Sequence, residues 1–97
     1  MAPGYVIAQI RVTDARTYPD YVRMVQPIVE KFGGKFLVRG GRSESYEGEP
    51  PGDRNVVIRF PSYEAAQNWY HSDEYSKAKA LRMSASESVQ TIVEGIE

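Results

Sequence analysis

Arginine is the residue type in this sequence with the clearest capacity to hold a small ligand. Arg11 and Arg39 lie near the ends of two strand-like segments, and guanidinium groups hold carboxylates or phosphates by paired hydrogen bonds. Arg82 lies on the apolar side of a helical segment, where a buried guanidinium needs a protein carboxylate or a ligand as partner. We expect Arg39 and Arg82 to be the best ligand-binding candidates, with Arg11 beside Arg39. The simpler alternative for each is a structural ion pair or a place at a wet rim.

Three aromatic residues follow one another closely and are further candidates for lining a ligand site. Trp69, Tyr70 and Tyr75 each combine a large contact area with a polar tip. Trp69 also stands one helical turn from Ala66, as expected of a helix packing on a sheet. We therefore expect Trp69 in the core, whereas for Tyr70 and Tyr75 both interpretations stay open.

The sequence names no catalytic residue. His71 is the only histidine and could act as a general base, but a lone histidine at a helix end is usually a surface residue. Ser72 fits a helix N-cap better than a nucleophile, because no histidine–acid relay accompanies it. One histidine and no cysteine argue against a transition-metal site, and the glycine pairs lack the spacing of a phosphate loop. We expect neither a metal nor a cofactor.

Length and charge exclude several classes of protein. The chain has 97 residues, which fits one domain over residues 1–97. Its 12 basic and 13 acidic residues give a formal net charge of -1, so nothing draws it to nucleic acid or to an anionic membrane. No stretch approaches the roughly 20 apolar residues of a membrane helix, and no signal-peptide pattern is present. We expect a cytoplasmic protein.

The elements that must position these side chains follow from hydrophobic periodicity. Alternation and β-branched residues predict strands over residues 5–12, 35–39, 55–60 and 89–93. Apolar residues at spacings of three and four predict a helix after Asp14 that ends at Gly33-Gly34. A second helical region begins at the N-cap Ser62, breaks near His71 and restarts at the N-cap Ser72. Residues 42–46 could continue the second strand past Gly40-Gly41, and residues 47–54 read as a loop.

The order of these elements predicts the fold class. A β-α-β-β-α-β order is that of a ferredoxin-like α+β fold. Right-handed crossovers then place the helices on one face of a four-stranded antiparallel sheet. Alternation assigns to that helix-covered face Val6, Ala8, Ile10, Phe36, Val38, Val56, Ile58 and Phe60.

The opposite face of the predicted sheet is mixed and suggests a homodimer. It carries Tyr5, Ile7, Gln9, Arg11, Lys35, Leu37, Arg39, Asn55, Val57 and Arg59. Monomers avoid leaving such an apolar patch in water, and a second copy packed sheet to sheet would cover it. Because the first two strands run parallel, Arg11 and Arg39 would lie at the same end of the enclosed cleft. A small polar or anionic molecule would suit that cleft.

Four segments together resemble a bacterial family, domain of unknown function 1330: GYVIAQIRVTD, GGKFLVRGG, NVVIRFPS and WYHSDEYSKAKALR. The resemblance covers nearly the whole chain and implies a ferredoxin-like fold in the dimeric α/β-barrel superfamily. The positions that match the family's recurring pattern are Arg39, Gly40, Gly41, Trp69, Tyr70, Ser72, Tyr75 and Arg82.

This superfamily does not point to one activity. It includes cofactor-free monooxygenases, haem-degrading enzymes, lactone isomerases and binding proteins, so the fold cannot select a function. The haem-degrading relatives use Asn, Trp and His from separate elements. Here Asn68, Trp69 and His71 are almost adjacent, so no catalytic role carries over.

Three functions remain open at the level of the sequence. The first is a homodimeric protein that binds a small polar or anionic organic molecule. The second is a cofactor-independent enzyme, monooxygenase-like or isomerase-like, acting on a small aromatic or carbonyl compound. The third is a structural or interaction module. The shortage of acid–base side chains favours binding.

Overall fold

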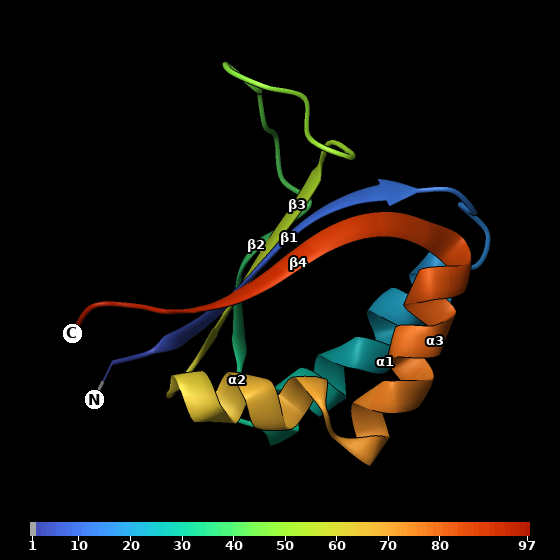
Figure 1. Ribbon diagram of the computed structural model, residues 1–97. Coiled ribbons are helices and arrows are strands. Elements are labelled where there is room, and N and C mark those ends of the chain that lie inside the picture. Colours follow the sequence, from blue (N-terminus) through green and yellow to red (C-terminus); the bar gives the residue numbers. More distant parts are fainter. Residues whose placement is uncertain (1) are drawn as a thin grey trace.

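The computed structural model describes residues 2–97, which contain four strands and three helices. They follow in the order β1 (Gly4–Val12), α1 (Tyr18–Lys31), β2 (Lys35–Arg39), β3 (Arg54–Phe60), α2 (Tyr63–Tyr70), α3 (Asp73–Ala85) and β4 (Ser86–Glu94). The strands form one antiparallel sheet in the order β2-β3-β1-β4. All three helices lie on the same side of this sheet (Figure 1). The ferredoxin-like α+β layout is thereby confirmed.

The helix boundaries follow from local capping. The Ser62 hydroxyl accepts a hydrogen bond from the Ala65 N–H at 3.0 Å, and the Ser72 hydroxyl accepts one from the Tyr75 N–H at 3.1 Å. Both predicted N-caps are confirmed, and α2 ends at Tyr70 with His71 as its C-cap, where a break was expected. Asp14 does not cap α1 directly, because its carboxylate instead accepts from Arg16 and Thr17 in the turn before the helix.

Two segments differ from the predicted strands. β4 begins at Ser86, directly after α3, because Ser86, Glu87 and Ser88 pair with the end of β1 although their side chains carry no strand signal. Residues 42–46 do not extend β2. Instead the chain from residue 40 to residue 53 leaves the sheet as a projecting loop (Figure 1). Gly40 turns it away with a positive φ of 71°.

An irregularity in β2 decides which way its side chains point. Phe36 pairs with Ile58, but Val38 pairs with Val57, so one residue of β2 is inserted at Leu37. Because side chains alternate with a period of two, such a bulge reverses the faces beyond it. Val38 therefore lies on the open face and Arg39 on the helix-covered face. The prediction for both residues was wrong.

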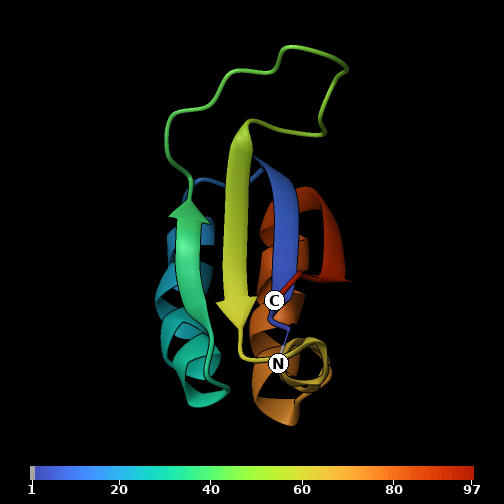
Figure 2. The same ribbon diagram turned by 90° about the vertical axis from the view of Figure 1, so that its left-hand side faces the viewer.

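The rest of the predicted core is confirmed. Val6, Ala8, Ile10, Val56, Ile58 and Phe60 are buried beneath the helices, and Phe36 is partly buried against them. The opposite face is seen directly in Figure 2, with the strands in front of the helices. It exposes a set of apolar side chains: Ile7, Leu37, Val38, Val89 and Val93. No helix in the described part of the chain is long and apolar enough to cross a membrane.

Candidate functional site

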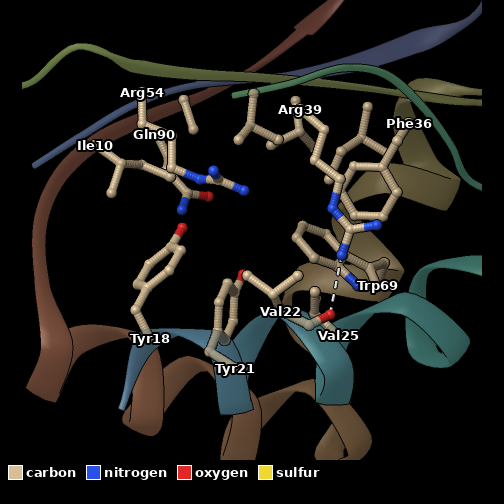
Figure 3. Close-up of a pocket in the computed structure, with 14 residues that line it drawn as sticks. Ile10, Tyr18, Tyr21, Val22, Val25, Phe36, Arg39, Arg54, Trp69 and Gln90 are labelled. Carbon is tan, nitrogen blue, oxygen red and sulfur yellow. Dashed lines mark hydrogen bonds between the residues drawn. The ribbon is translucent and has the colours of Figure 1, made fainter. Parts of the chain in front are cut away.

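A narrow chamber lies between the helix-covered face of the sheet and α1 (Figure 3). Its cavity volume is about 20 Å³. The walls are largely apolar, and six polar side chains also face it: Tyr18, Tyr21, Arg39, Arg54, Trp69 and Gln90. A mostly apolar space with a few convergent polar groups is the usual composition of a small-molecule site.

Arg39 ties the sheet to α1 across the chamber, as the dashed line in Figure 3 shows. Its Nη2 donates to the carbonyl oxygen of Val22 at 2.9 Å, and its Nη1 donates to the side-chain oxygen of Gln26. The guanidinium carbon lies 4.3 Å from the centre of the Phe36 ring. All these partners are uncharged, and Arg39 forms no ion pair within residues 2–97.

Arg54 is a second guanidinium at the chamber, contributed by β3. It lies over the Tyr18 ring, 5.3 Å from the ring centre, and its buried Nε has no hydrogen-bond partner within residues 2–97. Gly40 gives it room, because a Cβ at that position would overlap Nη1 of Arg54. Sequence reasoning missed Arg54, although its place two residues before Val56 in β3 puts it on the helix-covered face.

The chamber therefore holds positive charge without a counter-ion. The ion pairs found within residues 2–97 join Arg11 to Glu87, Arg23 to Asp20 and Lys31 to Glu74. None includes Arg39, Arg54 or Arg82, and no carboxylate is among the side chains that line the chamber. Arg39 and Arg54 are half-buried, and an anionic guest would pair with them by charge-assisted hydrogen bonds.

A buried hydrogen-bonded cluster adjoins the chamber through Tyr21. The hydroxyls of Tyr21 and Tyr75 are 3.0 Å apart, and Nε of Arg82 donates to the Tyr75 hydroxyl at 3.2 Å. Nη1 of Arg82 donates to the Ser88 hydroxyl at 2.7 Å. With the Gln90 amide oriented so that its oxygen faces Arg82, Nε and Nη1 each also lie 3.2 Å from that oxygen.

Burial sets the charge states within this cluster. Burial first, and then the neighbouring Tyr75, raise the pKa of Tyr21 well above its ordinary value, so its hydroxyl is neutral and available as a donor. Burial by itself would lower the pKa of Arg82, but the Tyr75 hydroxyl and its neighbours outweigh it and raise that pKa. Arg82 is thus a charged group that is only 3% exposed.

The aromatic candidates pack against one another beside this cluster. The Trp69 and Tyr75 ring centres are 4.2 Å apart, and Tyr70 lies 5.7 Å from Tyr75. Trp69 is 1% exposed, so its predicted place in the core is confirmed. Its indole Nε1 is nevertheless buried without a partner within residues 2–97. Trp69 is therefore a core residue that also lines the chamber, and its indole N–H is available to donate a hydrogen bond.

The structure brings five of the six candidate residues into one region. Arg39 and Trp69 line the chamber, Tyr75 and Arg82 belong to the cluster beside it, and Tyr70 borders a groove next to Arg82. Arg11 lies elsewhere, exposed and paired with Glu87. The expectation that Arg11 and Arg39 share the open face was wrong, because the β2 bulge carries Arg39 to the helix side. The chamber correspondingly lies beneath the helices and not on the open face.

Fold and site together define a class: a ferredoxin-like α+β domain with two arginines, Arg39 and Arg54, at a largely apolar space between sheet and helices. A protein of unknown function from Rhodopseudomonas palustris shares this fold with a TM-score of 0.80 at 20% identity, over 99% of this chain and 84% of that one. SnoaB, a cofactor-independent oxygenase from Streptomyces nogalater, has a TM-score of 0.68 at 10% identity, over 100% of this chain and 96% of its own. An ethyl tert-butyl ether D (EthD) family protein from Bacillus halodurans reaches 0.58 at 17% identity, over 99% and 100%.

The chain belongs to the family described as Domain of unknown function (DUF1330), whose model matches residues 3–96. The resemblance seen in the sequence is thereby confirmed. No curated protein is similar enough in sequence to match the chain. At these low identities the solved structures show a shared fold alone, so the function has to be argued from the site.

Proposed function

We propose that this protein binds a small organic anion in the chamber between the sheet and α1. The observation that carries the proposal is the presence of Arg39 and Arg54 in a largely apolar space without a carboxylate partner among the described residues. An anion would supply the missing counter-charge by charge-assisted hydrogen bonds. The apolar walls suit a flat hydrocarbon body, and the indole N–H of Trp69 can donate to an oxygen of the guest.

Binding requires Arg39 to change partners. The free space of about 20 Å³ holds little more than a water molecule, and Arg39 spans the chamber to Val22 and Gln26. An incoming carboxylate replaces these two neutral acceptors with a charged one, which is the stronger partner for a guanidinium. Arg39 thus both closes the chamber and recognises the guest.

We also propose that the open face of the sheet binds a second copy of the chain. Ile7 and Leu37 are 45% and 49% exposed on that face, and Val89 is 57% exposed. They lie on β1, β2 and β4, so the apolar surface extends across the sheet. A symmetric dimer buries such a surface against itself and leaves the chamber, on the opposite side, free to take a ligand.

A cofactor-independent enzyme is the second candidate, and the hydroxyl of Tyr21 is the observation that favours it. Tyr21 faces the chamber and bonds to Tyr75, which accepts from Arg82. A neutral hydroxyl supported in this way can donate to the negative oxygen that develops on a carbonyl substrate. SnoaB, which shares the fold, is described as a cofactor-independent oxygenase. Conversion of a bound carbonyl compound, lost in Tyr21→Phe, would support catalysis over binding.

Calorimetric titration with benzoate and with its neutral analogue benzamide tests the binding proposal. We expect benzoate to bind and benzamide to bind at least tenfold more weakly. Arg39→Gln and Arg54→Gln should each lower the affinity for benzoate about 10–100-fold, the loss of one charge-assisted bond. Arg23→Gln on the exposed side of α1 is the matched control. Equal affinity for the two probes, or unchanged benzoate affinity in both chamber variants, would contradict the proposal.

A further inference from the structure

We propose a second anion site outside the chamber, in which Arg82 holds the carboxylate of a small monoanion. The site is a groove beside the edge strand β4, bordered also by Tyr70, Met83, Ser86, Ser88 and Gln90. It shares only Gln90 with the chamber among the residues that line the two spaces. The groove has a volume of about 210 Å³, so a small acid fits without rearrangement.

Two of the three guanidinium nitrogens of Arg82 have hydrogen-bond partners. Nε and Nη1 are engaged by Tyr75, Ser88 and the Gln90 amide. Nη2 makes no hydrogen bond within residues 2–97. Arg82 is buried, without an ion pair in that part of the chain, and borders the groove. A buried guanidinium that borders a groove and has an unused donor is suited to recognise an oxyanion.

The hydroxyls around Arg82 add further donors. The Ser88 oxygen already accepts from Nη1 at 2.7 Å, so its own hydrogen is free to donate into the groove. The Tyr70 hydroxyl makes no hydrogen bond within residues 2–97 and borders the same space. The Ser86 hydroxyl, in contrast, donates to the carbonyl oxygen of Arg82 at 2.6 Å. Its hydrogen therefore stabilises the end of α3 and is not available to a ligand. Arg82, Ser88 and Tyr70 therefore form the oxyanion-binding set.

The charge of the groove selects the kind of anion. Arg82 is its one charged lining residue, and no carboxylate is among the others. A single guanidinium with neutral hydroxyl donors balances one negative charge, which a carboxylate carries and a phosphate monoester at neutral pH exceeds. Met83 supplies an apolar edge for a short hydrocarbon group. Short-chain carboxylic acids are thus the ligand class.

Nuclear magnetic resonance of the ¹⁵N-labelled protein tests this site, with propionate as probe and propionamide as its neutral analogue. We expect propionate to shift the Nε–H signal of Arg82 and the amide signal of Ser88 in a saturable way. The same shifts should persist in the chamber variant Arg39→Gln. Ser88→Ala should weaken binding about tenfold, the loss of one hydrogen bond to a charged group. Arg82→Lys should abolish the shift of the Ser88 amide signal.

Several outcomes overturn the assignment. No shift at Arg82 and Ser88, or equal shifts with propionamide, removes the anion site. A Ser88 amide shift that disappears in Arg39→Gln but persists in Arg82→Lys places the probe in the chamber instead. Tighter binding of methyl phosphate than of propionate contradicts the monoanion assignment. If Arg82→Lys does not fold, the Ser88→Ala and Tyr70→Phe variants decide, because unchanged affinity in both is incompatible with the donor set. The chamber is tested separately by benzoate, so either site can fail alone.

Discussion

At the scale of single residues, the Tyr21 hydroxyl links stability to alkaline pH. Its pKa is raised in the folded state by burial and by Tyr75, while in the unfolded chain it has the ordinary value near 10. The unfolded state therefore releases a proton first, and stability is lost as the pH rises above about 10. In Tyr21→Phe the free energy of unfolding should therefore fall less steeply above about pH 10, by up to about 1.4 kcal/mol per pH unit.

Urea unfolding of wild type and Tyr21→Phe between pH 8 and about pH 11 measures this difference. At neutral pH the variant should be about 1 kcal/mol less stable, because it lacks the hydrogen bond to Tyr75. The exposed Tyr46 provides the control Tyr46→Phe, which should follow wild type throughout. Parallel pH profiles for wild type and Tyr21→Phe would show that Tyr21 is not shielded as described.

Gly40 and Gly41 make a second comparison between neighbouring residues. Gly40 has a φ of 71°, and a Cβ there would overlap Arg54, whereas a Cβ at Gly41 meets nothing within 4 Å. Gly40→Ala should lower the free energy of unfolding by about 1–2 kcal/mol and weaken benzoate binding by displacing Arg54. Gly41→Ala should change stability by less than about 0.5 kcal/mol. Equal effects in urea unfolding would argue against this account of Gly40.

The arginines show how much of the site the sequence could predict. The periodicity of the sequence places Arg82 on an apolar helix face and so predicts it as a site residue. For Arg39 the sequence predicts the residue but the wrong face of the sheet, because the inserted residue in β2 leaves no mark in the alternating pattern of KFLVR. Arg54 directly follows a loop, and its residue type does not mark it as the start of a strand. Only the strand pairing shows that it faces the chamber.

At the scale of elements, the junction between α2 and α3 positions the aromatic cluster. The Ser72 hydroxyl accepts from the Tyr75 N–H at 3.1 Å and donates to the Trp69 carbonyl oxygen at 2.8 Å. It thus joins the end of one helix to the start of the next and fixes Trp69 relative to Tyr75.

Ser72→Ala should cost about 1 kcal/mol of stability, the usual value of an N-cap. Ser72→Asp should retain most of it, because a carboxylate also caps a helix and suits the positive end of its dipole. Ser76→Ala on the exposed side of α3 is the control and should be near neutral. Thermal or urea unfolding of the three variants checks this order, and a neutral Ser72→Ala would contradict the role of the cap.

Elements were easier to predict than their boundaries. The stripe in α1 and the caps at Ser62 and Ser72 are local signals, and the structure confirms them. The start of β4 depends on pairing with β1 across the sheet, which no local pattern encodes. The same holds for residues 42–46, where Gly40 turns the chain out of the sheet.

At the scale of the whole molecule, the open face of the sheet predicts a homodimer. Ile7→Glu places a charge at the centre of that face, opposite Val57 and Thr91. We expect wild type to sediment as a dimer at micromolar concentration and Ile7→Glu to sediment as a monomer with unchanged secondary structure. Met24→Glu makes the same apolar-to-acidic change on the exposed side of α1, and this variant should stay dimeric. A monomeric wild type would contradict the dimer proposal.

The central claim is that the chamber binds an organic anion, and Trp69 reports on it directly. It is the only tryptophan in the chain, its indole N–H has no partner within residues 2–97, and it faces the chamber. Its single indole ¹H–¹⁵N signal can therefore be followed while benzoate is added. We expect a saturable shift that benzamide does not reproduce at the same concentrations and that Arg39→Gln weakens. An indole signal that stays in place at saturating benzoate, or that moves equally with benzamide, would contradict the account.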